Sequence, residues 1–249
     1  MKVRGASVLI TGASRGLGAA LARELAHAGA RVVLVARDAG AIEEVARGIR
    51  AEGGEAHALA ADIADKEAIH RIGGAAAALV GPADILINNA ATLGTLPMPL
   101  LLDTDPEELE RVLRVNLVGP FRLTRLLLGP MVLRGHGLVL NVSSDAAVYA
   151  YPRWGAYGLS KAALEHMTRL WAAELEGSGV RIATVDPGEM NTRMHAEAVP
   201  ESDPSELADP AEAARAVVAL IRRIESVPGG TRVALSGESA LAAGEGRAE

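Results

Sequence analysis

The sequence predicts a single α/β domain over residues 1–249, in which a doubly wound parallel sheet carries helices on both faces. Short apolar runs alternate with longer segments of helical period along the chain, an order typical of parallel sheets. These runs read as strands buried on both faces. A chain of 249 residues with 49% hydrophobic residues suits one large core.

The expected elements follow from these two patterns in chain order. The candidate strands are apolar runs: Ser7–Ile10, Arg31–Ala36, Ala56–Ala60, Asp84–Ile87, Gly137–Val142, Arg181–Val185 and Thr231–Leu235. The candidate helices lie between them: Leu17–Ala28, Ala41–Ala51, Lys66–Val80, Pro106–Arg134, Tyr157–Glu176 and Pro210–Glu225. Gly29 and Gly177 follow two of these helices, where a residue of left-handed conformation often ends a helix.

Two segments depart from this alternation. Residues 198–210 are rich in Pro, Asp, Glu and Ser, which predicts a mobile surface loop. We expect residues 191–210 to form a modest lid over a substrate site. Residues 238–249 are small and polar, and we expect this tail to fray.

Composition excludes several classes of function. The net charge of −6, with no cluster of Lys or Arg, argues against a nucleic-acid partner. The absence of cysteine excludes disulfides and thiolate metal sites, and the six histidines show no metal-ligand spacing, so no metal is expected. No apolar segment is long enough for a membrane span, and no signal peptide precedes the first strand. A cytoplasmic protein without a membrane partner is therefore expected.

The glycine-rich turn Thr11–Gly18, TGASRGLG, follows the first apolar run and opens the first helix. A P-loop is excluded because no Gly-Lys-Ser/Thr follows. Gly12–Gly16 formally matches the G-x-S-x-G elbow of serine hydrolases, but no earlier strand is present to supply the usual oxyanion loop. The pattern favours a dinucleotide site of the Rossmann type, in which the backbone approaches a pyrophosphate at a helix N-terminus.

A second signal lies far downstream, where Tyr157 and Lys161 are four residues apart. On a helix both side chains lie on one face. A free tyrosine has a pKa of about 10, too high for efficient proton transfer near neutrality. A cation at Lys161 is therefore expected to lower the pKa of Tyr157.

Together these motifs resemble the classical short-chain dehydrogenase/reductase family, and the resemblance runs from about residue 5 to about residue 235. The further matching positions are Asp62-Ile63, Asn88-Asn89-Ala90, Asn116, Ser143-Ser144, Pro187-Gly188 and Thr192. The resemblance implies a catalytic tetrad of Asn116, Ser144, Tyr157 and Lys161. It selects Ser144 over Ser143 because Ser144 lies thirteen residues before Tyr157.

The resemblance also implies a role for each of these residues. Tyr157 would be the general acid/base, and Ser144 would bond the substrate oxygen. Lys161 would also hold the nicotinamide ribose, and Asn116 would hold a water that links Lys161 to solvent. Asp62 and Ile63 would hold and cover the adenine. The implied cofactor-binding set is Gly12, Ser14, Arg15, Gly16, Leu17, Gly18, Arg37, Asp62, Ile63, Asn89, Ala90, Tyr157, Lys161, Pro187, Gly188, Met190 and Thr192.

The preferred cofactor is expected to be NADP(H), with NAD(H) as the alternative. The carboxylate that usually binds the ribose 2′-hydroxyl in NAD sites is missing, because the second strand ends at Ala36 and Arg37 follows. Arg15 and Arg37 suit a 2′-phosphate, which guanidinium groups bind with paired hydrogen bonds. Asp38 is the opposing signal, since a shifted turn would bring it to a 2′-hydroxyl.

The expected activity is interconversion of a small-molecule carbonyl and a secondary alcohol by hydride transfer. A non-catalytic nucleotide-sensing module is the alternative. The resemblance implies a homodimer or homotetramer built through the helices of residues 106–134 and 157–176. The residues expected to border the substrate are Leu93, Leu96, Met98, Tyr149, Trp154, Met190 and Met194.

Three positions depart from the family pattern. Ala91 replaces a glycine, and Glu189 stands where an apolar residue is common. Glu189 either favours a polar or cationic substrate or points to solvent, and we prefer solvent. The chain after the last strand lacks the family's usual Asp-Gly-Gly, which leaves the role of the C-terminal region open.

Overall fold

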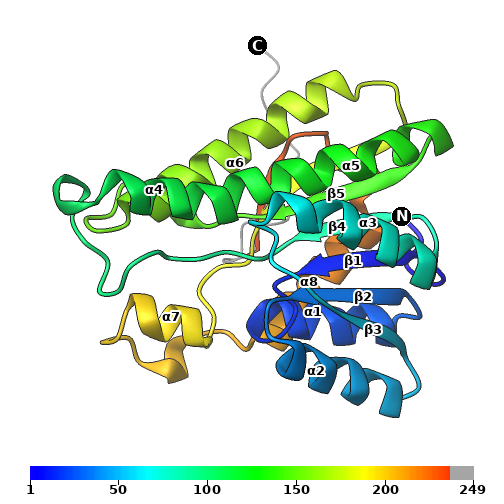
Figure 1. The fold of residues 1–249 in the computed structure, drawn as a ribbon, viewed down its shortest axis with the longest axis horizontal. Helices are drawn as coiled ribbons and strands as arrows, with labels where there is room; N and C mark the ends of the chain where they lie inside the picture. Colours follow the sequence, from blue (N-terminus) through cyan, green and yellow to red (C-terminus); the bar gives the residue numbers. More distant parts are fainter. Residues whose placement is uncertain (236–249) are drawn as a thin grey trace.

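A computed structural model describes residues 1–235 and confirms the predicted fold class. Seven parallel strands form one sheet in the order β3-β2-β1-β4-β5-β6-β7 (Figure 1). The strands are β1 Ser7–Thr11, β2 Arg31–Ala36, β3 Glu55–Ala60, β4 Ile85–Asn88, β5 Gly137–Val142, β6 Val180–Asp186 and β7 Arg232–Ala234. The strands run in chain order from β1 to β3 toward one edge of the sheet and from β4 to β7 toward the other, so the winding reverses between β1 and β4. A ligand is therefore expected at the carboxyl ends of these central strands.

Helices cover both faces of the sheet in two layers (Figure 1). One layer holds α1 Gly16–His27, α2 Ala39–Ala51 and α8 Pro210–Arg222, and the other holds α3 Lys66–Val80, α5 Gly119–Arg134 and α6 Gly155–Glu174. Strand residues alternate between the two cores: Val8 and Ile10 pack with the first layer and Leu9 with the second. The strands are thus buried on both faces, as their apolar runs predict.

Local capping fixes where several helices begin. The side chains of Asp38, Asp65 and Asp209 accept hydrogen bonds from the first backbone N–H groups of α2, α3 and α8. Helix α1 differs, because Arg15 at its N-cap makes no capping hydrogen bond and its first turn contains no acidic residue. Gly29 and Gly177 take the positive φ angles that their positions after helices predict.

The expectation of one continuous helix over Pro106–Arg134 was wrong. The segment is divided into α4, Pro106–Leu113, a π-helical turn, Arg114–Val118, and α5. Pro120 has no N–H to donate to the carbonyl of Asn116, four residues earlier. The turn widens accordingly, and the N–H of Gly119 bonds the carbonyl of Arg114.

The segment proposed as a lid carries structure of its own. It contains the short helix α7, Arg193–Ala198, and a 3₁₀ turn, Pro204–Glu206, so residues 198–210 are not wholly loop. Met190 and Ala208 form a parallel bridge that closes its base. The tail at 238–249 lies outside the described residues. Within residues 1–235, no helix has the length and apolar character that crossing a bilayer requires.

Candidate active site

The site residues predicted from sequence meet at the carboxyl ends of the central strands. The glycine turn follows β1, Asn89 follows β4, Ser144 follows β5, and Pro187 follows β6. These strands are neighbours in the sheet, so residues up to 176 positions apart in sequence share one edge. Open α/β sheets bind their ligands at this edge.

Two glycines of the turn are required by close backbone packing. Gly12 has a φ of +66°, and a Cβ there would lie 2.7 Å from the Cα of Ala90. A Cβ at Gly18 would collide with the carbonyl oxygen of Gly12. The absence of side chains therefore lets α1 start directly against the loop after β4.

Thr11 and Asn89 lock this turn to the loop. The Thr11 hydroxyl accepts hydrogen bonds from the backbone N–H groups of Asn89 at 3.0 Å and Ala90 at 3.1 Å. The Asn89 side chain donates to the carbonyls of Thr11 at 2.9 Å and Gly12 at 3.1 Å. Thr11 is not among the individual site residues predicted from the sequence. The sequence feature that could have indicated its role is a hydroxyl-bearing residue at the end of an otherwise apolar strand.

The start of α1 has the properties of an anion site. No side chain caps it and Arg15, at its N-cap, is exposed. Free N–H groups and the positive end of the helix dipole favour a phosphate. Thr192 approaches the same turn, because a Cβ at Gly16 would lie 3.4 Å from its Cγ2. Ser14 is partly buried and Leu17 buried in this turn.

Arg37 and Asp38 follow β2 and both are exposed. Within the described residues, neither Arg15 nor Arg37 has a side-chain hydrogen bond or an ion pair. Asp38 instead accepts a hydrogen bond from the N–H of Ala41 at 3.0 Å and caps α2. The two cations are therefore available to a ligand, whereas this carboxylate has a structural role.

Asp62 and Ile63 follow β3 but differ in surroundings. Asp62 is partly exposed and accepts a hydrogen bond from the N–H of Ala64 at 2.9 Å. Ile63 is buried in the core against α3 and α5, and its carbonyl lies close to Gly119. Asp62 is thus the more open of the two predicted adenine neighbours.

Asn116 lies in the π-helical turn with its side chain fully buried. Its amide accepts from the N–H of Thr92 at 2.8 Å and donates to the carbonyl of Thr92 at 2.9 Å and to the Ser160 hydroxyl at 2.9 Å. Both amide hydrogens are used. The side chain therefore joins the loop after β4 to helix α6. The water expected at Asn116 would have to bind another group of this residue, because both amide hydrogens are already donated.

The two adjacent serines after β5 face different neighbours. The Ser143 hydroxyl is buried and donates to Glu165 at 2.6 Å. Ser144 donates to Asp145 at 2.8 Å, and its side chain lies near enough to Tyr157 to lower the pKa of that phenol. The structure thus places Ser144, and not Ser143, beside Tyr157, as the spacing argument predicts.

Tyr157 is only 7% exposed, and burial raises the pKa of its phenol well above the ordinary value. The neighbouring Ser144 side chain opposes this effect, whereas the charges of Asp186 and Asp145 add to it. This corrects the expectation that Lys161 sets a lowered pKa. Desolvation of the phenolate is the largest effect in this structure.

Lys161 is also buried, and its ammonium donates to the carbonyl of Val142 at 2.7 Å. It lies over the Tyr157 ring, 5.5 Å from the centroid. Burial lowers the pKa of Lys161 to about 8, while the charges of Asp186 and Glu165 oppose that change. Tyr157 and Lys161 thus lie on one face of α6, as their spacing predicts.

Apolar side chains surround Tyr157. Leu93, Met98, Trp154 and Met194, four of the predicted lining residues, cluster with it. Trp154 meets the Tyr157 ring edge-on, with centroids 5.7 Å apart. The other predicted lining residues lie elsewhere: Leu96 and Tyr149 are exposed, and Met190 packs against the core under α1 and α8.

The segment after β6 turns sharply at Gly188, whose φ is +77°. Its N–H donates to Asp186 at 3.0 Å, and Pro187 is buried. The Glu189 side chain is 73% exposed, in line with the solvent-facing interpretation, and lies 3.6 Å from His195. Within residues 1–235, no group of three or more His, Asp or Glu side chains could hold a metal ion.

The comparisons agree with this geometry. A family model described as short chain dehydrogenase matches residues 6–203. A short chain dehydrogenase of Pseudocercospora fijiensis is 38% identical over 198 residues, which cover 78% of this chain and 63% of that protein. The chain therefore spans less than two thirds of that relative's length.

Two solved structures extend the comparison to nearly the whole chain. A metagenomic short-chain oxidoreductase in complex with NADP is 35% identical, with a TM-score of 0.76 and coverage of 89% of this chain and 92% of that one. A 3-ketoacyl-(acyl-carrier-protein) reductase from Brucella melitensis complexed with NADH is 30% identical, with a TM-score of 0.85 and coverage of 96% and 100%. With a family model matched over most of its length, this chain belongs to the short-chain dehydrogenase/reductase family of oxidoreductases.

Proposed function

We propose that this protein is an NADP(H)-dependent oxidoreductase that interconverts a carbonyl and a secondary alcohol. The observation that carries the proposal is the environment of Tyr157. Its buried side chain lies beside Ser144, which lowers the pKa of the phenol, and beneath the Lys161 ammonium, at the sheet edge that also bears the glycine turn. A proton donor, a partner for the substrate oxygen and a buried cation thus occupy one place.

The residues present suit a dinucleotide. The uncapped start of α1 offers N–H groups to a pyrophosphate, and Gly12 and Gly18 keep side chains out of the turn. Ser14, Gly16, Leu17, Asp62, Asn89, Ala90, Pro187, Gly188, Met190 and Thr192 complete the set that we propose holds the cofactor. When bound, a nicotinamide dinucleotide supplies the donor or acceptor of the hydride.

The preference for NADP(H) over NAD(H) is supported by the charges after β1 and β2. Arg15 and Arg37 are exposed without a partner among the described side chains, whereas Asp38 caps α2. A 2′-phosphate would gain two guanidinium partners at these positions. The metagenomic relative is bound to NADP and the Brucella relative to NADH, so relatives with this fold bind either dinucleotide.

Each tetrad member has a distinct part in the proposed reaction. Tyr157 donates its proton to the carbonyl oxygen in reduction and removes the hydroxyl proton in oxidation. Proton donation leaves a phenolate in a buried site, and the ammonium of Lys161 over the ring stabilises that charge. Ser144 orients the substrate oxygen. The side chain of Asn116 already donates both amide hydrogens, so we assign the water that would link Lys161 to solvent to the backbone carbonyl of Asn116. Pro120 has no N–H group to donate to this carbonyl.

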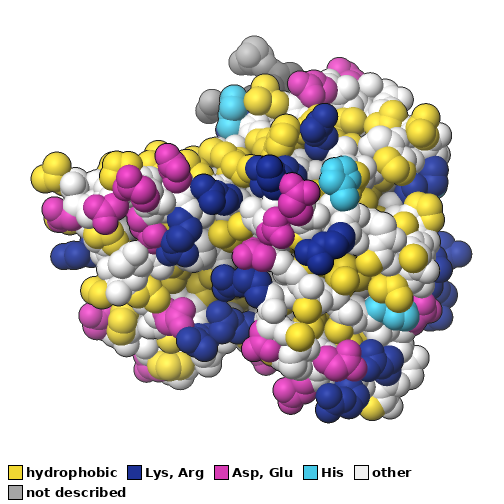
Figure 2. Space-filling view, in the orientation of Figure 1, with side chains coloured by type: hydrophobic (Ala, Val, Ile, Leu, Met, Phe, Trp, Pro, Cys, Tyr) yellow, Lys and Arg dark blue, Asp and Glu magenta, His cyan; other side chains and the backbone are white. Residues whose placement is uncertain are grey.

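Two structural roles accompany the reaction. We propose that residues 191–210 cover the site, since Thr192 lies close to the glycine turn and Met194 packs near Tyr157. We also propose a homodimer or homotetramer through α4, α5 and α6. Exposed apolar side chains on these helices include Phe121, Leu133 and Leu170. Figure 2 shows hydrophobic side chains among the charged ones along the face that carries α4 and α5.

The test is the absorbance change of NADPH and of NADH with a panel of ketones, aldehydes and quinones. We expect oxidation of NADPH by the wild type and its loss in Tyr157→Phe. Turnover that survives this substitution would contradict the role of Tyr157. Turnover with NADH in preference to NADPH would contradict the roles of Arg15 and Arg37. A parallel Ser14→Ala variant addresses the hydrolase interpretation, because activity that survives this substitution would rule out Ser14 as a nucleophile.

A further inference from the structure

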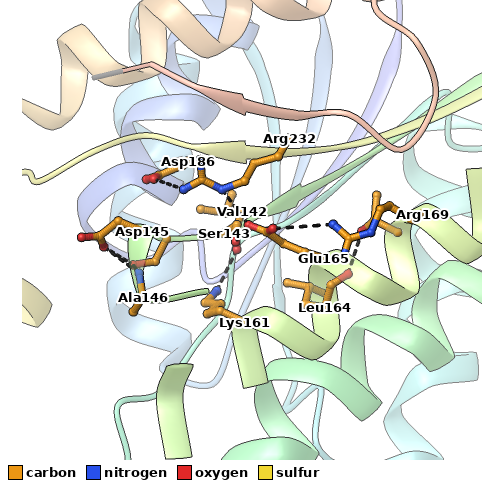
Figure 3. Close-up of polar contacts among 12 residues, drawn as sticks. Val142, Ser143, Asp145, Ala146, Lys161, Leu164, Glu165, Arg169, Asp186 and Arg232 are labelled. Carbon is orange, nitrogen blue, oxygen red and sulfur yellow. Dashed lines mark hydrogen bonds and ion pairs between the residues drawn. The ribbon is translucent and has the colours of Figure 1, made fainter. Parts of the chain in front are cut away.

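An ionic network of Arg232, Glu165 and Asp186 lies near Lys161 (Figure 3). Arg232, on β7, donates through Nε to Glu165 at 2.9 Å and through a terminal nitrogen to Asp186 at 2.6 Å. The two carboxylate side chains are each 6% exposed, and the guanidinium side chain is 24% exposed. Charges buried to this degree require close partners, and Arg232 is the partner that both acids share.

The network ties together the segments that bear the site. Glu165 lies on α6 one turn after Lys161 and also accepts a hydrogen bond from Ser143, the residue before Ser144. Asp186 ends β6 and accepts from the N–H of Gly188 in the proposed cofactor loop. Arg232 thus ties the end of β6 to the middle of α6, and Glu165 extends this link to Ser143 after β5.

We propose that Arg232 is a positioning residue for the Tyr157–Lys161 pair, because it neutralises the two buried carboxylates that would otherwise compete for the Lys161 ammonium. The inference deepens the proposed function and rests on it for its kinetic consequence. Arg232 lies beyond residues 6–203, the segment that the family model matches.

The charged groups around Lys161 come from four elements. Glu165, on α6, and Asp186, at the end of β6, act on Lys161 itself, and Arg232, on β7, is bonded to both; Asp145, after β5, acts on Tyr157. Arg169 is a further cation on α6, but its side chain is 53% exposed and lies 4.0 Å from Glu165. Solvent screens such a pair far more than the buried one.

The sign of the effect follows from these charges. Glu165 and Asp186 raise the pKa of Lys161, which burial holds at about 8. Removal of the Arg232 cation leaves their negative charge uncompensated, so the ammonium form is favoured and the pKa of Lys161 rises. The pKa of Tyr157 rises as well, because Asp186 disfavours the phenolate.

Lysine NMR measures this directly in the full chain without cofactor. The chain has three lysines, at positions 2, 66 and 161, so side-chain labelling with carbon-13 gives a short spectrum. Lys161→Met identifies the signal of Lys161. We expect the titration midpoint of Lys161 near pH 8 in the wild type. In Arg232→Met we expect a midpoint that is higher by about one pH unit. A shift of this size is typical of the loss of a nearby unit charge at an effective dielectric constant of about 20.

Three further variants separate charge from structure. Arg232→Met combined with Glu165→Gln removes one charge of each sign, and we expect the midpoint to return toward the wild-type value. Arg232→Lys keeps the cation and should leave the midpoint near 8. Arg169→Met removes the exposed cation and should have a smaller effect than Arg232→Met. If Arg232→Met does not fold, Glu165→Gln alone still tests the sign, because its midpoint should fall.

The kinetic readout distinguishes this inference from the proposed function. In alcohol oxidation, we expect the lower limb of the pH profile of kcat to move to higher pH in Arg232→Met and to be restored in the double variant. If Arg232→Met lowers kcat but leaves both the pH profile of kcat and the titration midpoint of Lys161 unchanged, Arg232 has a merely structural role and the inference is overturned. An inactive wild type with the expected shifts of the midpoint overturns the proposed function alone.

Discussion

The Lys161 ammonium lies over the face of the Tyr157 ring, 5.5 Å from its centroid, and donates to the carbonyl of Val142. This relationship couples two buried groups with opposite tendencies. Burial raises the pKa of the phenol and lowers that of the ammonium, so both favour their neutral forms. A proton that leaves Tyr157 creates a charge that the nearby Lys161 cation stabilises, so the charge state of Lys161 matters for the proposed chemistry.

Substitution of Tyr157 tests the acid/base role. We expect Tyr157→Phe to lower kcat for carbonyl reduction by about 10²–10⁴-fold, the usual contribution of a positioned proton donor. Binding of NADPH, followed by tryptophan fluorescence, should be retained because the ring still packs against Trp154. An equal loss of cofactor binding would assign Tyr157 a structural role instead.

The pH dependence follows from the pKa of Lys161. Its ammonium is present below pH 8 and is lost as the pH rises through about 8. We therefore expect kcat/KM for carbonyl reduction to be level at lower pH and to decline above about pH 8. The measurement uses saturating NADPH with a correction for its spontaneous decay in acid. A profile that stays level to pH 10 would contradict this assignment.

Cofactor preference depends on the two free guanidinium groups. Loss of a charge-assisted hydrogen bond costs about 1.5–3 kcal/mol, so Arg37→Ala should raise the KM for NADPH by about tenfold or more. The KM for NADH should stay nearly constant, because the two dinucleotides differ by the 2′-phosphate. Arg47→Ala, on the exposed side of α2, is the matched control and should change neither value. An equal rise for both dinucleotides would argue against a 2′-phosphate contact.

The glycine turn is expected to tolerate no side chain at Gly18. A Cβ there meets the backbone of Gly12, so Gly18→Ala should lower the free energy of unfolding by more than about 2 kcal/mol. Gly48→Ala in α2 is the control, because its Cβ meets nothing within 4 Å. That change should stabilise the protein by about 0.5–1 kcal/mol. Thermal unfolding of both variants measures the difference.

Asn116 is expected to contribute to stability as well as to the site. Asn116→Ala removes hydrogen bonds to Thr92 and Ser160 and leaves buried polar groups unpaired. We expect a loss of about 2–3 kcal/mol in denaturant unfolding. Asn191→Ala, at an exposed position, should change stability by less than about 0.5 kcal/mol. A small loss for Asn116→Ala would mean that these contacts are weak.

Local features of the sequence determined the fold class and most of the site. Apolar runs alternating with helical segments predicted all seven strands of the described sheet within a residue or two at each end. The turn at residues 11–18 and the four-residue interval from Tyr157 to Lys161 are local, because helix geometry alone places both side chains on one face. The π-helical turn was missed, although Pro120 carries its signal.

Only the tertiary structure decided the protonation chemistry and the long-range ties. The direction of the Tyr157 pKa depends on which groups exclude water from the phenol, and these come from separate parts of the chain. Arg232 reaches Glu165 across 67 positions of sequence, and Asn116 reaches Ser160 across 44. Spacing and propensity are properties of short segments, whereas desolvation and charge pairing arise only when distant segments pack together.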